Sequence, residues 1–289
     1  MFDTAIIGTG PAGLSAALTL KMRGKEIIWF GSPKYSGKIE KSEKIGNYPG
    51  LGLISGPDLN ERFRAHAEAL DIQTTDKLVT SISKLKNHFM LLADNEVFEA
   101  KTVLLATGVI SSKPFPGEEK LLGRGVSYCA TCDGMFYKGK TIAVFCGAKR
   151  YETEVEYLAE LAEKVYLMPA YRDCGVKGEN IELINSPIKE IAGEKRVQSI
   201  RLGNESELSV DGFFCLRGAI APASLVPGLA LEGPHILTDK QMATNIPGCF
   251  AAGDCTGAPY QIAKAVGEGN VAAHSILEAL ADMKNPGQA

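Results

Sequence analysis

A strand, a glycine-rich turn and a helix at the N-terminus constrain the fold of this chain more than any other feature. Residues 4–7 read as a short buried strand, residues 8–13 are Gly-Thr-Gly-Pro-Ala-Gly, and an Ala/Leu-rich helix follows over 14–22. In a G-x-G-x-x-G motif the first glycine permits the tight turn, the second lets a pyrophosphate approach the backbone, and the third lets helix and strand pack closely. The helix N-terminus then faces the phosphates. The motif predicts a dinucleotide-binding α/β fold with nucleotide contacts at Gly8, Gly10, Pro11, Ala12 and Gly13.

Two later strands also end in turns that are typical of a dinucleotide-binding fold. Residues 102–108 form a buried strand that ends in a small-residue turn, and the strand that starts at Cys249 ends in Gly253 and Asp254. An acid at that position can bind a ribityl or ribose hydroxyl. Each segment alone is an ordinary strand end, but their joint occurrence favours a bound flavin dinucleotide. The strand at 26–30 ends in Phe-Gly-Ser without an acid, so the adenosine must be held by other groups.

The composition excludes several classes of protein. The chain has 289 residues, enough for two domains, and its 45% hydrophobic and 22% charged residues are typical of a globular protein. A net charge of −3 without a Lys/Arg-rich run gives no reason to expect nucleic acid. No apolar run reaches the roughly 18 residues that span a membrane, and the first residues predict a strand rather than a signal peptide. Seven scattered cysteines suit a reducing compartment, so we expect a cytoplasmic protein.

A pair of cysteines followed by an acid is the main chemical feature. Cys129 and Cys132 are separated by two residues, and Asp133 follows at once. Such a pair can close a disulfide or open to a dithiol whose attacking sulfur has a lowered pKa, and the acid can move the proton that exchange requires. The alternative is half of a zinc site, which needs a second pair of ligands, and no other C-x-x-C or paired His/Cys occurs. We therefore predict a redox centre and no metal.

Taken together, these motifs resemble those of the low-molecular-weight thioredoxin reductases. The shared segments, which are spread through nearly the whole length of the chain, are 8–13, 47–50, 106–108, 123–133 and 251–254. The resemblance implies an α/β two dinucleotide-binding-domain flavoprotein, with tandem Rossmann-like three-layer domains and the second inserted into the first. The FAD-binding domain would be 1–112 plus 222–289, and 113–221 would be the insert, which carries the redox dithiol and the pyridine-nucleotide site. FAD, a thioredoxin partner and a homodimer are implied as well.

The resemblance also gives roles to individual residues. Cys132 would be the sulfur nearer the flavin, Cys129 the thiol that is released, and Asp133 the acid that protonates it. The dithiol would then exchange with thioredoxin through a mixed disulfide, and either cysteine could make the first attack. Further FAD contacts are implied at Gly31, Lys38, Asn47, Ala106, Thr107, Gly108, Gly253, Asp254, Gln261 and Ile262.

The second nucleotide loop departs from the family pattern. After the strand at 141–145 the family has G-x-G-x-x-A, whereas residues 146–151 here are Cys-Gly-Ala-Lys-Arg-Tyr. Cys146 and Ala148 add side chains where glycine allows the backbone to approach a phosphate, and Tyr151 adds a ring where the helix should close on the strand. The acidic run at 152–156 would repel phosphates from the helix N-terminus. We expect that NADPH is not used.

A second segment, residues 169–171, also indicates that NADPH is not used. After the strand at 164–168 the family carries H-R-R, whose arginines hold the 2′-phosphate of NADPH, and this chain has Pro-Ala-Tyr at 169–171. An alternative remains, in which NADPH binds in an altered geometry through Lys149, Arg150 and Arg172.

Without a hydride site, electrons must reach FAD by another route. The chain is similar to the ferredoxin-dependent flavin thioredoxin reductases of anaerobes such as clostridia, which share the C-A-T-C, a degenerate loop and a shortened insert, here with one hairpin over 188–202. Ferredoxins are acidic, so a docking face is expected at Lys138, Lys140, Lys149 and Arg150. The expected activity is that of a ferredoxin:thioredoxin reductase. The alternatives are an NADPH-dependent enzyme and a non-enzymatic flavin redox sensor.

Two further departures fall near the expected flavin. Ser-Gly-Lys at 36–38 stands where many relatives have G-G-Q, and Tyr-Gln-Ile at 260–262 stands where they have R-Q-A. The loss of a cation at Tyr260 should make the flavin harder to reduce or leave its ring stacked on the phenol.

Overall fold

The computed structural model describes residues 1–94, 96–108, 114–217 and 222–284, without the side chains of Cys132, Ala223 and Lys284. It divides into two compact units, Met1–Ile110 with Leu225–Ala289, and Ser111–Ser224. The domain boundaries expected from the sequence, 112/113 and 221/222, adjoin positions outside the described ranges. Each unit contains a mainly parallel sheet covered by helices, so the expected α/β class with two Rossmann-like units is confirmed.

The sheet of the first unit brings three strand ends to one edge. Its order is β2–β1–β5–β4–β3, and β16 also pairs with β5. Ile7 and Ala251 both lie opposite Leu105, so the carboxyl ends of β1, β16 and β5 meet. Open α/β sheets bind ligands at such an edge. The strands of this sheet are β1 (Phe2–Ile7), β2 (Ile27–Phe30), β3 (Val79–Lys84), β4 (Phe89–Ala93), β5 (Glu96–Leu105) and β16 (Cys249–Ala251). The unit also contains β14 (Leu231–Glu232) and β15 (His235–Ile236), which pair with each other.

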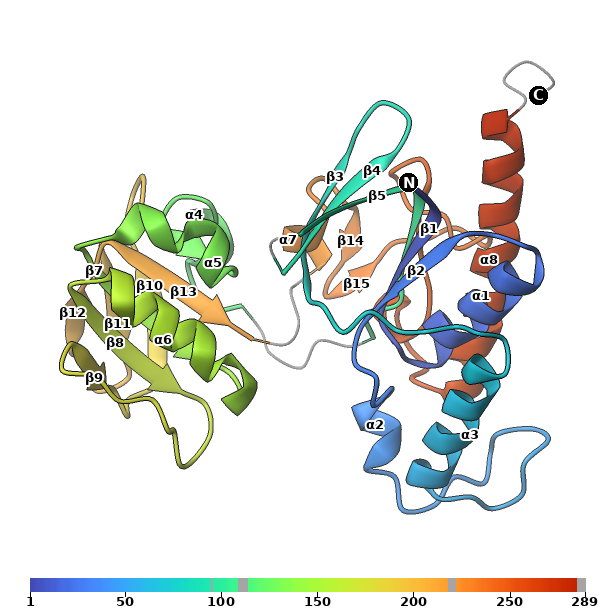
Figure 1. Cartoon of the computed structure of the whole chain (residues 1–289), viewed down its shortest axis with the longest axis horizontal. Coiled ribbons are helices and arrows are strands. Elements are labelled where there is room, and N and C mark those ends of the chain that lie inside the picture. The colour runs from blue at the N-terminus through green and yellow to red at the C-terminus, as the bar shows by residue number, and fades with distance from the viewer. Residues whose placement is uncertain (95, 109–113, 218–221, 285–289) are drawn as a thin grey trace. The chain divides into compact units, whose positions relative to one another are not determined.

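Helices α1 (Pro11–Met22) and α8 (Ile262–Lys284) lie side by side in this unit (Figure 1). They can approach closely because Gly269 has no side chain. A side chain there would lie 2.2 Å from the carbonyl oxygen of Ala12. Small and aliphatic residues such as Ala16 and Ile276 fill their shared core. Among the described helices, none is both long enough and apolar enough to cross a membrane. The unit also contains α2 (Gly37–Glu40), α3 (Gly56–Glu68) and η3 (Asp254–Thr256).

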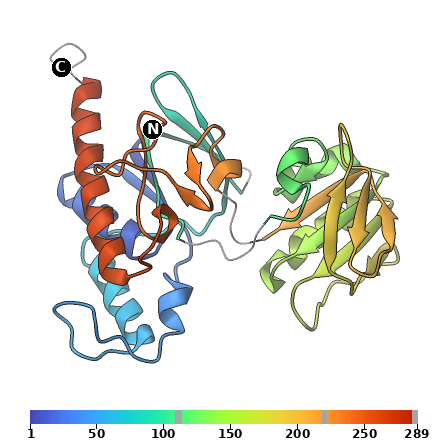
Figure 2. The ribbon, with the colours of Figure 1, turned by 180° about the vertical axis from the view of Figure 1, so that it is seen from behind.

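The second unit has a five-stranded parallel sheet in the order β6–β13–β7–β8–β9. Helix α6 covers one face, and the three-stranded sheet β10–β11–β12 lies on the other, as the two opposite views show (Figures 1 and 2). The expected hairpin over 188–202 is confirmed as β10 and β11. The strands are β6 (Val126–Ser127), β7 (Thr141–Cys146), β8 (Lys164–Pro169), β9 (Ile181–Leu183), β10 (Ile188–Ala192), β11 (Ser199–Leu202), β12 (Glu207–Ser209) and β13 (Gly212–Leu216).

Short helices connect these strands. They include α4 (Glu118–Leu121), α5 (Ala130–Asp133), η1 (Gly134–Tyr137), η2 (Lys149–Tyr151) and the longer α6 (Glu152–Leu161). Helix α7 (Pro222–Leu225) spans the boundary between the two units.

Candidate functional site

The loop after β1 has the geometry that a dinucleotide requires. Gly8 has φ +113°, and a side chain there would lie 2.2 Å from the carbonyl oxygen of Ala106. A side chain at Gly13 would lie 2.0 Å from the carbonyl oxygen of Gly8, so helix and strand touch through bare backbone. A side chain at Gly10 would meet no atom within 4 Å. The loop therefore leaves open space where a pyrophosphate would approach, at the start of a helix whose N-cap receives no side-chain hydrogen bond.

The other backbone positions predicted for the cofactor gather at the same sheet edge. The amide of Ala106 donates to the carbonyl of Ile7 (2.8 Å), and Thr107 and Gly108 follow in the chain. Gly253 follows β16 with φ +89° and donates its amide to the Glu268 carboxylate (2.8 Å). Gly31 follows β2, and a side chain at this position would contact Thr9.

The predicted polar contacts form hydrogen-bonded pairs across distant segments. Lys38 Nζ lies 2.8 Å from Asp254 Oδ2, and the Asn47 side-chain amide donates to Gln261 Oε1 (2.8 Å). Ile262, the first residue of α8, packs against the apolar cluster around Ile39. These residues are far apart in the sequence, and the fold brings them together within the first unit.

The structure also connects the two departures from the family pattern at 38 and 260. Lys38 Nζ lies 5.1 Å from the centre of the Tyr260 ring, within the range of a cation–π contact. The Tyr260 hydroxyl lies 2.7 Å from His235 Nε2. A lysine from another segment therefore lies beside the position at which many relatives carry an arginine.

Two residues that shape this site were not anticipated. The indole of Trp29 is almost fully buried and donates to the carbonyl of Gly8 (2.9 Å), which fixes the first turn of the loop. Glu268 accepts from Gly253 and from the hydroxyl of Thr256 (2.9 Å). A buried tryptophan on β2 and a glutamate nearly two turns into α8 were visible in the sequence, but nothing there showed which loop they contact.

The predicted dithiol lies at the start of α5 in the second unit. Cys129 is disulfide-bonded, and the side chain of Cys132 lies outside the described part of the structure. The Cys129 amide donates to Ser127 Oγ (3.1 Å), and Asp133 donates its amide to the carbonyl of Cys129 (3.3 Å). Cys129 is partly exposed, whereas Cys146, Cys215, Cys249 and Cys255 are free and buried.

Exposed apolar side chains follow the disulfide directly. Met135 and Phe136 of η1 are 58% and 71% exposed, although Gly134 beside them is packed against Leu158 of α6. Large apolar groups held in water on a short rigid helix are typical of a contact surface for another protein.

The loop after β7 is filled by side chains of its own unit. The Cys146 thiol is buried and lies 3.4 Å from the Tyr171 hydroxyl, which donates to Glu152 Oε1 (2.9 Å). The same carboxylate oxygen accepts from the Gly175 amide (2.9 Å), and that bond, with the Tyr171 hydroxyl, lowers the pKa of Glu152. Tyr151 is buried in the core beneath.

The predicted basic docking face is wrong as a single cluster. Lys138 and Lys140 precede β7, while Lys149 and Arg150 follow its end, so the two pairs lie at opposite ends of a six-residue strand. That separation is roughly 20 Å at about 3.3 Å per residue. Arg150 is also engaged, since it lies over the Tyr151 ring and donates to its hydroxyl (2.7 Å).

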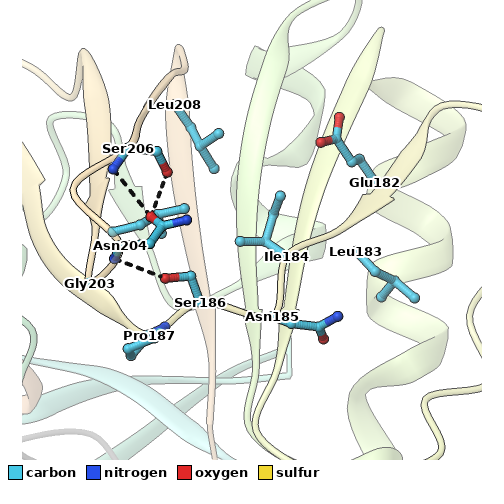
Figure 3. Close-up of a pocket in the computed structure, with 11 residues that line it drawn as sticks. Glu182, Leu183, Ile184, Asn185, Ser186, Pro187, Gly203, Asn204, Ser206 and Leu208 are labelled. Carbon is cyan, nitrogen blue, oxygen red and sulfur yellow. Dashed lines mark hydrogen bonds between the residues drawn. The ribbon is translucent and has the colours of Figure 1, made fainter.

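A shallow pocket of about 710 Å³ lies elsewhere in the second unit (Figure 3). It lies between the segment after β9 and the β11–β12 turn, where Asn204 Oδ1 accepts from the amide and hydroxyl of Ser206. None of the residues that line it belongs to the predicted sites. Across the described ranges, no group of three or more His, Cys, Asp or Glu side chains could hold a metal ion.

Comparison with known proteins agrees with this geometry. Residues 2–269 match the family described as pyridine nucleotide-disulphide oxidoreductase. The thioredoxin reductases of Listeria innocua and Helicobacter pylori are 32% and 34% identical to this chain; the alignments cover 98% and 97% of it, and 95% and 99% of those proteins.

Solved structures agree as well. A ferredoxin-flavin thioredoxin reductase from Clostridium acetobutylicum is 44% identical, with a TM-score of 0.87 and 98% of each chain covered. A thioredoxin reductase from Gloeobacter violaceus is 28% identical, with a TM-score of 0.77, covering 100% of this chain and 96% of that one. Family membership implies a flavin cofactor, and the open glycine loop of the first unit fits one. The chain belongs to the low-molecular-weight thioredoxin reductase family of flavoprotein oxidoreductases.

Proposed function

We propose that this protein is a flavin-dependent thioredoxin reductase that receives electrons from reduced ferredoxin and does not use NADPH. The observation that carries the proposal is the filled loop after β7. Tyr171 and Glu152 bond to each other and to Cys146 and Gly175 where a nucleotide would need bare backbone and free amides. A dinucleotide phosphate at the start of α6 would meet the negative Glu152 carboxylate, which the Gly175 amide and the Tyr171 hydroxyl hold in place.

The first unit supplies the residues for FAD. Gly8, Gly10 and Gly13 would receive the pyrophosphate at the start of α1, and Asp254 would bind a ribityl or ribose hydroxyl. Lys38, Asn47 and Gln261 would line the remainder as side chains already held in pairs. Pro11, Ala12, Gly31, Ala106, Thr107, Gly108, Gly253 and Ile262 complete the proposed set. Bound FAD would accept electrons one at a time and pass a pair to the disulfide.

The second unit supplies the dithiol that would act on thioredoxin. We infer that Cys129 and Cys132 carry the electron pair and that Asp133 protonates the thiolate that is released when the disulfide is reduced. One protein thiolate then attacks the partner's disulfide, a mixed disulfide forms, and the second thiol resolves it to leave both cysteines oxidised and the partner reduced. Met135 and Phe136, next to the disulfide, would offer the partner an apolar contact.

The donor is the finer part of the proposal. Two structures of ferredoxin-flavin thioredoxin reductase from Clostridium acetobutylicum are 42% and 44% identical to this chain. The thioredoxin reductases of Listeria innocua and Helicobacter pylori are 32% and 34% identical. A one-electron protein donor needs only a docking face, so it does not require the nucleotide loop. We also infer the homodimer that the family resemblance implies, which sedimentation at micromolar concentration would test.

An anaerobic comparison of reductants tests the function directly. The purified FAD-loaded protein is mixed with reduced ferredoxin, NADPH or NADH, and both the flavin absorbance and the reduction of a thioredoxin are followed. We expect bleaching and turnover only with ferredoxin. Rapid bleaching by NADPH would contradict the proposal and favour an NADPH-dependent enzyme. Bleaching by ferredoxin without thioredoxin reduction would favour a redox sensor.

A cysteine variant tests the role of the dithiol. Cys132→Ser should retain FAD and its bleaching by ferredoxin but lose thioredoxin reduction. Cys174→Ser is the matched control, because Cys174 is a free thiol in the same unit, and it should retain turnover. Full activity of Cys132→Ser would refute the assigned role.

A further inference from the structure

The second unit contains a buried ion pair that the proposed chemistry does not use. Glu118 of α4 is fully buried and Arg217, just after β13, is 6% exposed. They form a salt bridge, and they are the only charged residues among the buried ones that the structure describes. Removing two charges from water is costly, and apolar residues of similar volume often give equal stability. A role in positioning other residues would therefore explain this buried ion pair better than a contribution to stability.

The pair holds two other segments through the two oxygens of one carboxylate. Glu118 Oε1 accepts from Arg217 and from the Tyr128 hydroxyl (2.8 Å). Glu118 Oε2 accepts from the backbone amide of Phe115 (2.8 Å). The Arg217 guanidinium also lies over the Phe115 and Tyr128 rings, 5.8 and 5.9 Å from their centres.

Tyr128 connects this network to the redox disulfide, because it is the residue before Cys129. Its ring is buried, and burial followed by the adjacent Glu118 carboxylate raises its pKa, so the hydroxyl stays protonated and donates. The only regular structure before it is β6, a two-residue strand at the edge of the sheet. So short an edge strand fixes the chain weakly. The buried tyrosine therefore anchors the backbone next to Cys129, in addition to the hydrogen bonds that Cys129 makes with Ser127 and Asp133.

We propose that Glu118, Arg217 and Tyr128 form a clamp that positions Cys129 for disulfide closure. The three are positioning residues, since none of them is a thiol or an acid at the disulfide. The clamp holds residue 128 in the conformation in which Cys129 is oxidised. Loss of the clamp should therefore weaken closure and make the disulfide easier to reduce. This inference rests on the proposed role of the disulfide in electron transfer.

The test is a glutathione equilibrium on the FAD-loaded full-length protein. Two glutathione thiols reduce the protein disulfide to two thiols and become one glutathione disulfide, and the peptide that carries Cys129 is quantified after alkylation. Tyr128→Phe removes only the hydroxyl, and we expect the closure constant to fall about tenfold, equivalent to about 30 mV for this two-electron couple. Glu118→Gln should give a shift at least as large. Tyr166→Phe, a hydroxyl deletion on β8, is the control and should match wild type.

Several outcomes would overturn the clamp. Closure constants of both variants within twofold of wild type, with lower melting temperatures, would show that the network only stabilises the fold. An equal shift in Tyr166→Phe would show that the effect is not specific. If Glu118→Gln does not fold, Tyr128→Phe decides alone. The equilibrium uses neither ferredoxin nor NADPH nor thioredoxin, so its failure is distinct from a failure of the proposed function.

Discussion

The loop after β1 and the loop after β7 each follow an inner strand of a mainly parallel sheet, but one is open and the other is filled. In the first, three glycines keep side chains out of the turn, and the position of Gly10 faces open space. In the second, Tyr151 enters the core and Tyr171 bonds to Cys146 and Glu152. The contrast teaches that two loops at similar positions can differ in whether bare backbone or side chains occupy the turn. The second unit keeps its parallel sheet with this filled loop.

The largest expected effect comes from Gly13→Ala in the open loop. The new methyl would lie 2.0 Å from the carbonyl oxygen of Gly8, so helix and strand must separate. We expect a loss of more than about 3 kcal/mol in the free energy of unfolding, above the usual cost of overpacking. Chemical denaturation with and without FAD measures it. A stable variant that binds FAD would show that close backbone packing is not what the motif requires.

Tyr151→Ala in the filled loop should rank second. The tyrosine is 7% exposed in the core of the second unit, and its truncation should cost about 3 kcal/mol. NADPH binding should not appear, because Tyr171 and Glu152 still occupy the loop. Denaturation and NADPH titration by fluorescence measure the two parts. A gain of NADPH affinity would mean that one ring, rather than the whole cluster, closes the site.

Gly10→Ala separates cofactor binding from stability. Its φ of −79° suits alanine and the new methyl meets no atom, so the apoprotein should unfold within about 0.5 kcal/mol of wild type. FAD affinity should fall by roughly tenfold or more, since the methyl occupies the space that the pyrophosphate would approach. Fluorescence titration of the apoprotein with FAD checks this. Unchanged affinity would place the cofactor elsewhere.

The smallest effect is a pH dependence at Glu152. The Gly175 amide, with the Tyr171 hydroxyl, lowers the pKa of this carboxyl in the folded state. A lowered folded pKa adds stability above the ordinary glutamate pKa of about 4.3, and that increment disappears as the pH falls through the folded value. Glu152→Gln should therefore melt below wild type at pH 7, and the two curves should converge below pH 4. Glu156→Gln, on the exposed side of α6, should show no such pattern.

Sequence patterns predicted the parts of the site that depend on local backbone geometry. Gly13 is required by a clash with the Gly8 carbonyl inside one strand–turn–helix, so its role could be deduced from spacing alone. The clash that requires Gly8 is with Ala106, which follows β5, although the motif spacing also indicated this glycine. The filled loop was predicted from Tyr151, but the contribution of Tyr171 was not. Its hydroxyl reaches Glu152 from beyond the next strand, and no spacing rule gives that contact.

The wrong prediction of one basic docking face and the contacts that were not predicted also have physical causes. Lys140 and Lys149 are close in sequence, but a strand runs between them, and its length alone separates them. Glu118 and Arg217 are 99 residues apart, so their pairing depends on the register of β13 against β6. The contact between Lys38 and Tyr260 likewise depends on how α2 and the segment before α8 meet.

The burial of the remaining thiols determines which sulfurs of the protein can react with oxidants. Burial raises the pKa of Cys249 to about 12 and of Cys255 to about 11, and it raises the pKa of Cys215 as well. Peroxide and similar agents attack thiolates, so these three sulfurs should be spared while Cys129, which is partly exposed, responds once its disulfide is reduced. A cell recovering from a burst of oxygen could then restore the enzyme by re-reducing one bond, without having to replace the protein.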